Sequence, residues 1–126
     1  MINPAFLAYL ADVAEDLDAA RKLRGNRFAA FHVQQAAEKL VKALRIAHGL
    51  RPTVDHHIDA LLAEIPESEL RTRMSGLDDW SDFATTFRYP SPGGRRRPGP
   101  ADSDIDAAIA EIESLVPLVR DLAPRG

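Results

Sequence analysis

The chain has 126 residues, of which 45% are hydrophobic and 28% charged, and this length and composition predict a single globular domain over residues 1–126. No apolar run reaches the roughly 20 residues of a membrane helix, and the N-terminus carries acids where a signal peptide carries positive charge, so we expect a cytoplasmic protein without a membrane segment. The lack of cysteine excludes disulfides, a thiol nucleophile and a thiolate metal site.

The formal net charge of −3 conceals a segregation of charge along the chain. Residues 21–51 hold eight Lys or Arg against one acid, and residues 88–97 hold four arginines and no acid, whereas residues 1–20 and 101–115 are acidic. This pattern favours a basic face that meets a phosphate-bearing partner. The alternative is that the charges solvate helix surfaces or pair between helices, since a globally acidic domain is a poor generic nucleic-acid binder.

The first helix is predicted to begin at Pro4, with Asn3 as its N-cap, and to end before a turn at Gly25. Its apolar stripe consists of Phe6, Leu10, Val13, Leu17 and Ala20. Its acids are expected to face away from that stripe: Asp12, Glu15, Asp16 and Asp18. We expect Asn26, which follows the turn, to cap the next helix.

The second helix is predicted from about Arg27 to His48, with Gly49 as its stop. Because the turn before it is short, it should pack antiparallel to the first helix. A polar row of Gln35, Glu38 and Lys42 runs beside its apolar stripe. The row could line a groove, but Glu38 and Lys42 have the favourable i,i+4 orientation, so a hydrogen-bonding row is the preferred interpretation.

A short third helix is predicted after a loop at residues 49–54, with Asp55 as its cap. Its apolar residues are Ile58, Leu61, Leu62 and Ile65. Pro66 should end it and open a fourth helix, which extends from about Glu67 to Phe87 with a break or bend at Gly76.

Residues 88–101 contain four prolines and three glycines and are predicted to form a surface loop. The last helix should begin at Asp102 or Ser103, with a kink or an early end at Pro117. No useful strand-like alternation occurs. The sequence therefore predicts an all-α, antiparallel up-and-down helical bundle of four main helices plus one short helix.

Four segments have an order of residues that periodicity alone does not explain. They are QQAAEKLVKAL in the second helix, DHHIDALL at 55–62, FRYP at 87–90 and the acidic last helix DSDIDAAIAEIESLV. Together, in this order, they resemble the HEPN domain family of small helical proteins. The resemblance implies a helical bundle that commonly forms a homodimer and is often the partner of a minimal nucleotidyltransferase in toxin–antitoxin pairs.

Other members of that family are metal-independent ribonucleases with an Arg-x(4–6)-His motif at a dimer cleft. Arg88 matches the arginine of the motif, but no histidine follows it, and none occurs after His57. A general acid–base group is therefore missing from its usual place. The string from Arg51 to His56 fits Arg-x4-His, but it lies before the short helix and not in the family's catalytic segment. We expect no cofactor, and we find no companions at metal-ligand spacing for the histidines.

Arg88, Tyr89 and His56 are the candidate ligand-binding residues, together with Arg95, Arg96 and Arg97. Arginine offers a planar fork of donors for a phosphate, and a tyrosine ring can stack on a base. Each has a structural alternative. Arg88 and Tyr89 could end a helix, His56 could bond backbone at the start of the short helix, and the three loop arginines could be solvated.

These residues favour a non-catalytic interaction module that docks phosphate groups of a nucleotide or RNA. The expected partners are a second copy of the chain and a separately encoded nucleotidyltransferase. The alternative is an endoribonuclease toxin in which Arg88 stabilises phosphate charge and a displaced histidine, His56, acts as the acid–base group. A third possibility is a purely structural dimer.

Overall fold

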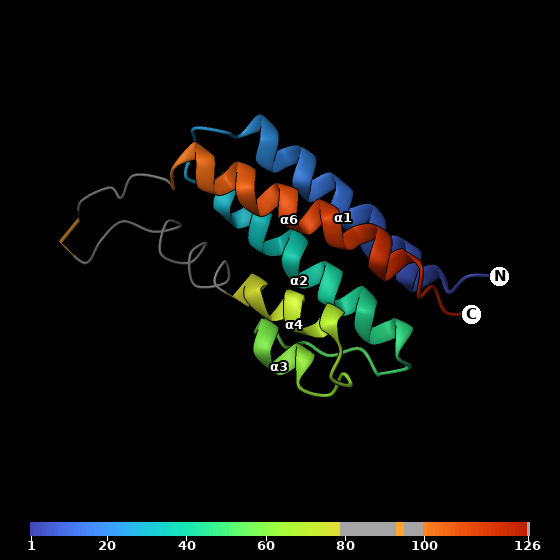
Figure 1. Ribbon diagram of the computed structural model, residues 1–126. Coiled ribbons are helices and arrows are strands. Elements are labelled where there is room, and N and C mark those ends of the chain that lie inside the picture. The colour runs from blue at the N-terminus through green and yellow to red at the C-terminus, as the bar shows by residue number, and fades with distance from the viewer. Residues whose placement is uncertain (79–92, 95–99, 126) are drawn as a thin grey trace.

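The computed structural model describes residues 1–78, 93–94 and 100–125, and within them the chain is a bundle of helices (Figure 1). The helices are α1 (Pro4–Lys22), α2 (Ala29–Ala47), α3 (Ile58–Leu62), α4 (Glu69–Ser75), the 3-10 helix η1 (Gly76–Asp78) and α6 (Asp102–Arg120). The described residues form no strand, and an isolated bridge joins Ile2 to Arg125. The predicted all-α fold is confirmed. None of these helices is both long and apolar enough to cross a membrane.

Leaving aside the short α3, the α-helices of the described residues alternate in direction from α1 through α2 and α4 to α6, as an up-and-down bundle requires (Figure 1). α1 and α2 form the predicted antiparallel hairpin, and α6 lies along both. At one end of the bundle the Asn3 amide donates to the Pro124 carbonyl at 2.9 Å, which brings the two termini together. At the other end Arg24, which follows α1, pairs with Asp106 near the start of α6. α6 is therefore antiparallel to α1.

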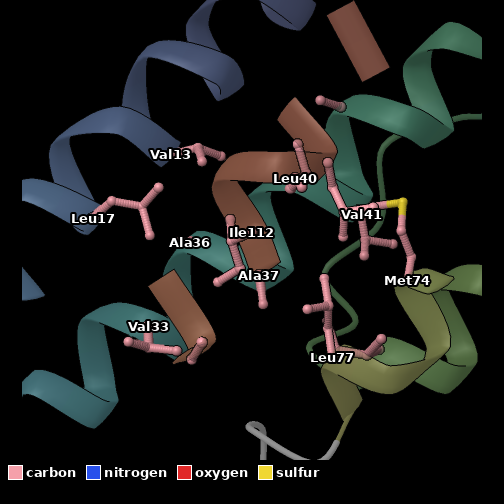
Figure 2. Close-up of a cluster of buried hydrophobic side chains, with 14 of the residues drawn as sticks. Val13, Leu17, Val33, Ala36, Ala37, Leu40, Val41, Met74, Leu77 and Ile112 are labelled. Atoms are coloured by element: carbon pink, nitrogen blue, oxygen red, sulfur yellow. The ribbon is translucent and has the colours of Figure 1, made fainter. Parts of the chain in front are cut away.

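The core lies around α2, which packs against α1, α3 and α6. Figure 2 shows side chains from five elements meeting there: Val13 and Leu17 of α1, the row Val33–Val41 of α2, Met74 of α4, Leu77 of η1, and Ile112 of α6. Ala36 and Ala37 are small, so neighbouring helices approach α2 closely. Each buried Leu or Ile contributes about 1.5–3 kcal/mol of burial free energy, which makes α2 the element on which the others depend.

The start of α1 confirms the capping prediction. The Asn3 side chain accepts hydrogen bonds from the amides of Ala5 at 2.9 Å and Phe6 at 3.2 Å. Asn26 does accept from the Phe28 amide at 2.9 Å, but α2 begins later than predicted, with Phe28 in the N-cap position. Gly25 turns the chain between the helices with φ of 87°, a conformation that glycine adopts without a steric penalty.

The ends of the short helices differ from the prediction. His57, not Asp55, occupies the N-cap of α3, and the Asp55 carboxylate accepts instead from the His56 amide. α4 begins after Ser68, whose hydroxyl accepts from the Arg71 amide at 3.0 Å. Pro66 was predicted to open this helix at its first position, but the Ser68 cap starts the helix at Glu69, three residues later.

Two predicted helix breaks have different outcomes. At Gly76 α4 gives way to the 3-10 helix η1, as the predicted break implied. Of the kink or early end predicted at Pro117, the early end is wrong, because α6 continues to Arg120, and the kink stays a prediction. Pro117 is exposed, and the buried Val119 after it holds the last turn on the core. The rest of the predicted fourth helix, to Phe87, lies outside the described residues, as does most of the predicted loop 88–101.

Candidate functional site

Of the residues predicted for the site, His56 alone lies in the described part of the chain. Arg88 and Tyr89 lie outside it, and so do Arg95, Arg96 and Arg97, so these five stay predictions. The candidate site in the described residues is therefore centred on His56.

His56 lies in the segment between α2 and α3, and its side chain is 73% exposed. Its Nδ1 makes a hydrogen bond with Oε1 of Glu38, which is on α2. The imidazole thus bonds a carboxylate and not the backbone, contrary to the structural alternative. Because Nδ1 faces the carboxylate, Nε2 on the opposite side of the ring is left for a ligand.

Glu38 is 3% exposed, and its carboxylate contacts three polar side chains. Besides His56, the Lys42 ammonium lies 3.3 Å from Oε1, and the Gln34 amide donates to Oε2 at 3.3 Å. We call Glu38, His56, Lys42 and Gln34 the Glu38 cluster. A carboxylate this deeply buried is stable only when it is paired and hydrogen-bonded, so the cluster is a defined structure and not a solvated helix face.

The predicted polar row is confirmed in part. Glu38 and Lys42 do pair along α2, but Gln35 donates to Gln34 at 2.9 Å and not to Glu38. The burial of Glu38 was not predicted. In the sequence Glu38 follows Ala37, which belongs to the apolar stripe. That position is compatible both with an exposed side chain at the edge of the stripe and with a buried one, so the sequence does not decide between them.

Arg45 fixes the segment that carries His56. This buried side chain donates to the Leu61 carbonyl at 2.8 Å, to the Arg51 carbonyl at 3.3 Å and to the Glu64 carboxylate at 3.1 Å. Its role was not predicted from the sequence. Since both ends of residues 51–61 are tied to α2, His56 is held against Glu38 by a constrained segment.

A second group of similar composition joins α1 to α2. Asp16 accepts from His32 Nδ1 at 3.0 Å and from Lys39 Nζ at 2.7 Å. We call these three residues the Asp16 cluster. The prediction that Asp16 faces away from the core is wrong, because its side chain is 12% exposed and turns toward α2, where it bonds the His32 ring and pairs with the Lys39 ammonium.

Two larger hollows in the described residues contain none of the predicted site residues. One, of about 530 Å³, lies between α3 and α4 and is lined by Asp59, Glu67 and Arg71 among others. The other, of about 230 Å³, is a mostly apolar groove between α1 and α6. The Glu38 cluster is therefore the candidate site that combines a predicted residue with convergent charged groups.

The arrangement of the cluster permits two kinds of chemistry. A neutral imidazole with its proton on Nδ1 accepts through Nε2, and a protonated one donates from it. With Lys42 beside it, the exposed edge of His56 can bind a phosphate oxygen or exchange a proton with a bound group.

Comparisons with known proteins agree with this fold. The model of the HEPN domain matches residues 10–122. The crystal structure of TT1696 from Thermus thermophilus is similar with a TM-score of 0.69 at 22% identity, over 95% of this chain and 99% of that one. The archaeal HEPN homologue ST0689 is similar with a TM-score of 0.64 at 23% identity, over 92% of this chain and 95% of that one. No curated protein gives a match.

Proposed function

The chain belongs to the HEPN domain family, and we propose that it acts as a non-catalytic interaction module that docks phosphate groups of a nucleotide or RNA. The observation that carries this proposal is the Glu38 cluster. It holds His56 by Nδ1, leaves Nε2 exposed and places the Lys42 ammonium next to it.

The docking surface is proposed to extend to residues outside the described ranges. Arg88 would supply a donor fork for a phosphate, Tyr89 a ring for a base, and Arg95, Arg96 and Arg97 further positive charge. The family resemblance supports a homodimer and a separately encoded nucleotidyltransferase as the protein partners. The lack of a histidine after Arg88 supports a binding role over catalysis.

The same cluster also favours a second candidate, a metal-independent ribonuclease. A buried carboxylate that orients an exposed imidazole through Nδ1 is an arrangement that general acid–base catalysis uses. In this alternative His56 moves the proton and Arg88 stabilises charge on the phosphate.

One experiment distinguishes the two candidates. A fluorescently labelled single-stranded RNA is titrated by anisotropy, and its cleavage is followed in the same metal-free samples, with wild-type protein, His56→Ala and Arg88→Ala. His57→Ala is the matched control, because His57 is exposed and its side chain makes no capping bond. We expect binding to weaken about tenfold in the two site variants, since a charge-assisted hydrogen bond contributes about 1.5 kcal/mol or more, and we expect no cleavage.

The opposite outcomes are equally clear. If Arg88→Ala and His56→Ala bind RNA like wild type, the site assignment is wrong. If wild-type protein cleaves RNA and both site variants do not, the non-catalytic proposal is replaced by the ribonuclease.

A further inference from the structure

A small niche lies next to the Glu38 cluster, where α1, α2 and the segment after α2 meet. Its lining includes Tyr9 of α1, Lys42 and Arg45 of α2, and Arg51 and Thr53 of the following segment. Its volume is about 10 Å³. A space of roughly 10–15 Å³ holds one water molecule, so the niche holds one oxygen-sized atom.

The side chains around the niche supply mainly hydrogen-bond donors. Tyr9 is half-buried against the core, and its hydroxyl makes no bond to any other residue in the described ranges. The Arg51 guanidinium is likewise unpaired within the described part of the chain. The Thr53 hydroxyl accepts from the Asp55 amide at 3.2 Å, so its own hydrogen remains available. Donors that line one small niche favour a ligand atom that accepts several hydrogen bonds, as a phosphate oxygen does.

Three cationic side chains line the niche, and one of them has no carboxylate partner in the described residues. Lys42 faces Glu38, and Arg45 faces Glu64. Arg51 is the arginine of this group for which the described residues offer no carboxylate. The local excess of positive charge therefore belongs to Arg51, an exposed residue that lines the niche.

Lys42 and the backbone that carries Arg51 are held in place before any ligand binds. Arg45 holds the Arg51 carbonyl at 3.3 Å and thereby ties the start of the segment to α2. Tyr9 and Lys42 are on long helices, and the Lys42 side chain is 16% exposed. Preorganised donors on rigid elements lose little freedom when a ligand binds.

The niche shares Lys42 with the Glu38 cluster. Oε1 of Glu38 is shared by His56 Nδ1 and by Lys42 Nζ, and Lys42 also lines the niche. A phosphate at the niche is therefore one side chain away from the residue that the proposed function places at the docking surface.

From this geometry we infer that the niche is a phosphate-binding site, with Tyr9, Lys42, Arg51 and Thr53 as donors to a phosphate group of a nucleotide or RNA. One phosphate oxygen enters the niche, and the Arg51 guanidinium binds the oxygens at its mouth. The inference rests on the proposed function for the nature of the ligand, and it adds the residues that bind the phosphate.

The test uses inorganic phosphate as a probe of the niche itself. Binding is measured by calorimetry and by amide chemical shifts at low ionic strength, for wild type, Arg51→Gln and Tyr9→Phe. Arg120→Gln is the control for the loss of one positive charge, because Arg120 is exposed on α6 and unpaired in the described ranges. Tyr9→Phe keeps the ring and removes the hydroxyl alone. We expect about a tenfold loss in Arg51→Gln and about a threefold loss in Tyr9→Phe, with Arg120→Gln like wild type.

A second arm identifies the source of the phosphate. A short RNA with a 5′-phosphate is compared with the same RNA carrying a 5′-hydroxyl. If the 5′-phosphate strengthens binding and the gain disappears in Arg51→Gln, the niche takes a terminal phosphate. If both RNAs bind equally and both weaken in Arg51→Gln, it takes an internal phosphodiester.

The failure of this inference is distinct from the failure of the proposed function. If RNA binding depends on His56 and Arg88 but neither Arg51→Gln nor Tyr9→Phe changes phosphate or RNA binding, the niche is not a site and the docking function stands. If neither RNA binds but phosphate binding still depends on Arg51 and Tyr9, the niche stands and the proposed function is wrong. If Arg120→Gln weakens phosphate binding as much as Arg51→Gln does, the loss of affinity is due to net charge alone, and the inference is wrong.

Discussion

The Asp16 cluster and the Glu38 cluster consist of the same kinds of group in different surroundings. Each has a largely buried carboxylate that accepts from a histidine through Nδ1 and pairs with a lysine of α2. In the Asp16 cluster every member is on α1 or α2, and the His32 side chain is 28% exposed. In the Glu38 cluster the histidine comes from the segment after α2 and is 73% exposed.

This difference separates a structural role from a binding role. Two rigid helices that share a buried carboxylate are held together by it, and there is little open surface left for a ligand. A histidine that one carboxylate orients, with most of its ring in solvent, stabilises little and presents its Nε2 edge outward. We therefore expect the Asp16 cluster to contribute to folding, and the Glu38 cluster to contribute to binding through His56.

The largest expected effect is on the folding side. Asp16→Ala removes the acceptor of both His32 and Lys39, which leaves the half-buried His32 Nδ1 without its acceptor and Lys39 with only the longer pair to Asp12. Such a loss costs about 1–3 kcal/mol, so we expect the free energy of unfolding to fall by about 2 kcal/mol. Urea denaturation followed by circular dichroism measures this, and phosphate binding by the folded variant should equal that of wild type.

Asp12→Ala is the matched control for that variant. Asp12 is on the same helix and lies 4.0 Å from Lys39, but its side chain is 51% exposed. Because an exposed pair contributes little, the change should stay below about 0.5 kcal/mol. Equal losses in Asp12→Ala and Asp16→Ala would show that burial does not set the strength of this cluster.

The two histidines give the most direct test of the comparison. His32→Ala removes a bond to Asp16 and an edge-on contact with the Phe31 ring, whose centroid lies 5.3 Å away. We expect it to cost about 1 kcal/mol of stability without affecting phosphate binding. His56→Ala should change stability by less than about 0.5 kcal/mol, because Glu38 keeps Lys42 and Gln34, and should weaken phosphate binding.

Thermal unfolding and calorimetric titration of the two variants, side by side, check both halves of this prediction. If His56→Ala is as destabilising as His32→Ala and leaves binding unchanged, both clusters are structural and the comparison fails.

The two clusters also show which features of the structure the sequence alone can predict. Helical periodicity and caps were enough for the fold, because the stripe from Phe6 to Ala20 and the Asn3 cap depend on residues close together in the chain. The burial of Asp16 and Glu38 depends on which polar side chains from other turns and segments pack beside them. Those neighbours are set by tertiary packing, which periodicity does not encode.

The site itself was predicted through one residue in the described part of the chain. The motif at residues 55–62 identifies His56. The sequence pattern places its partner Glu38 in a polar row on the helix surface and gives no role to Arg45 or Tyr9. A long polar side chain at the edge of an apolar stripe is compatible with either exposure or burial. The distances to Leu61, Arg51 and Glu64 are what identify Arg45 as an anchor.

The smallest expected effect belongs to an exposed ion pair outside both clusters. Arg24 donates to the two carboxylate oxygens of Asp106 at 3.0 and 2.8 Å, and this hydrogen-bonded guanidinium lowers the pKa of Asp106 below its ordinary 3.8. Each side chain is 51% exposed, so the pair should be weak and sensitive to salt.

The direction of its pH dependence follows from that pKa. A carboxyl whose pKa is lower in the folded than in the unfolded chain stabilises the fold above its unfolded value, and this contribution disappears as the pH falls through the lowered folded value. Asp106→Asn should therefore have a slightly lower melting temperature than wild type at neutral pH, and the difference should shrink below pH 3.8. Melting curves recorded across this range, with and without about 1 M salt, make the measurement. A difference that persists in acid and in salt would mean that Asp106 acts by packing, and the contrast between exposed pairs and the buried carboxylates would lose its electrostatic basis.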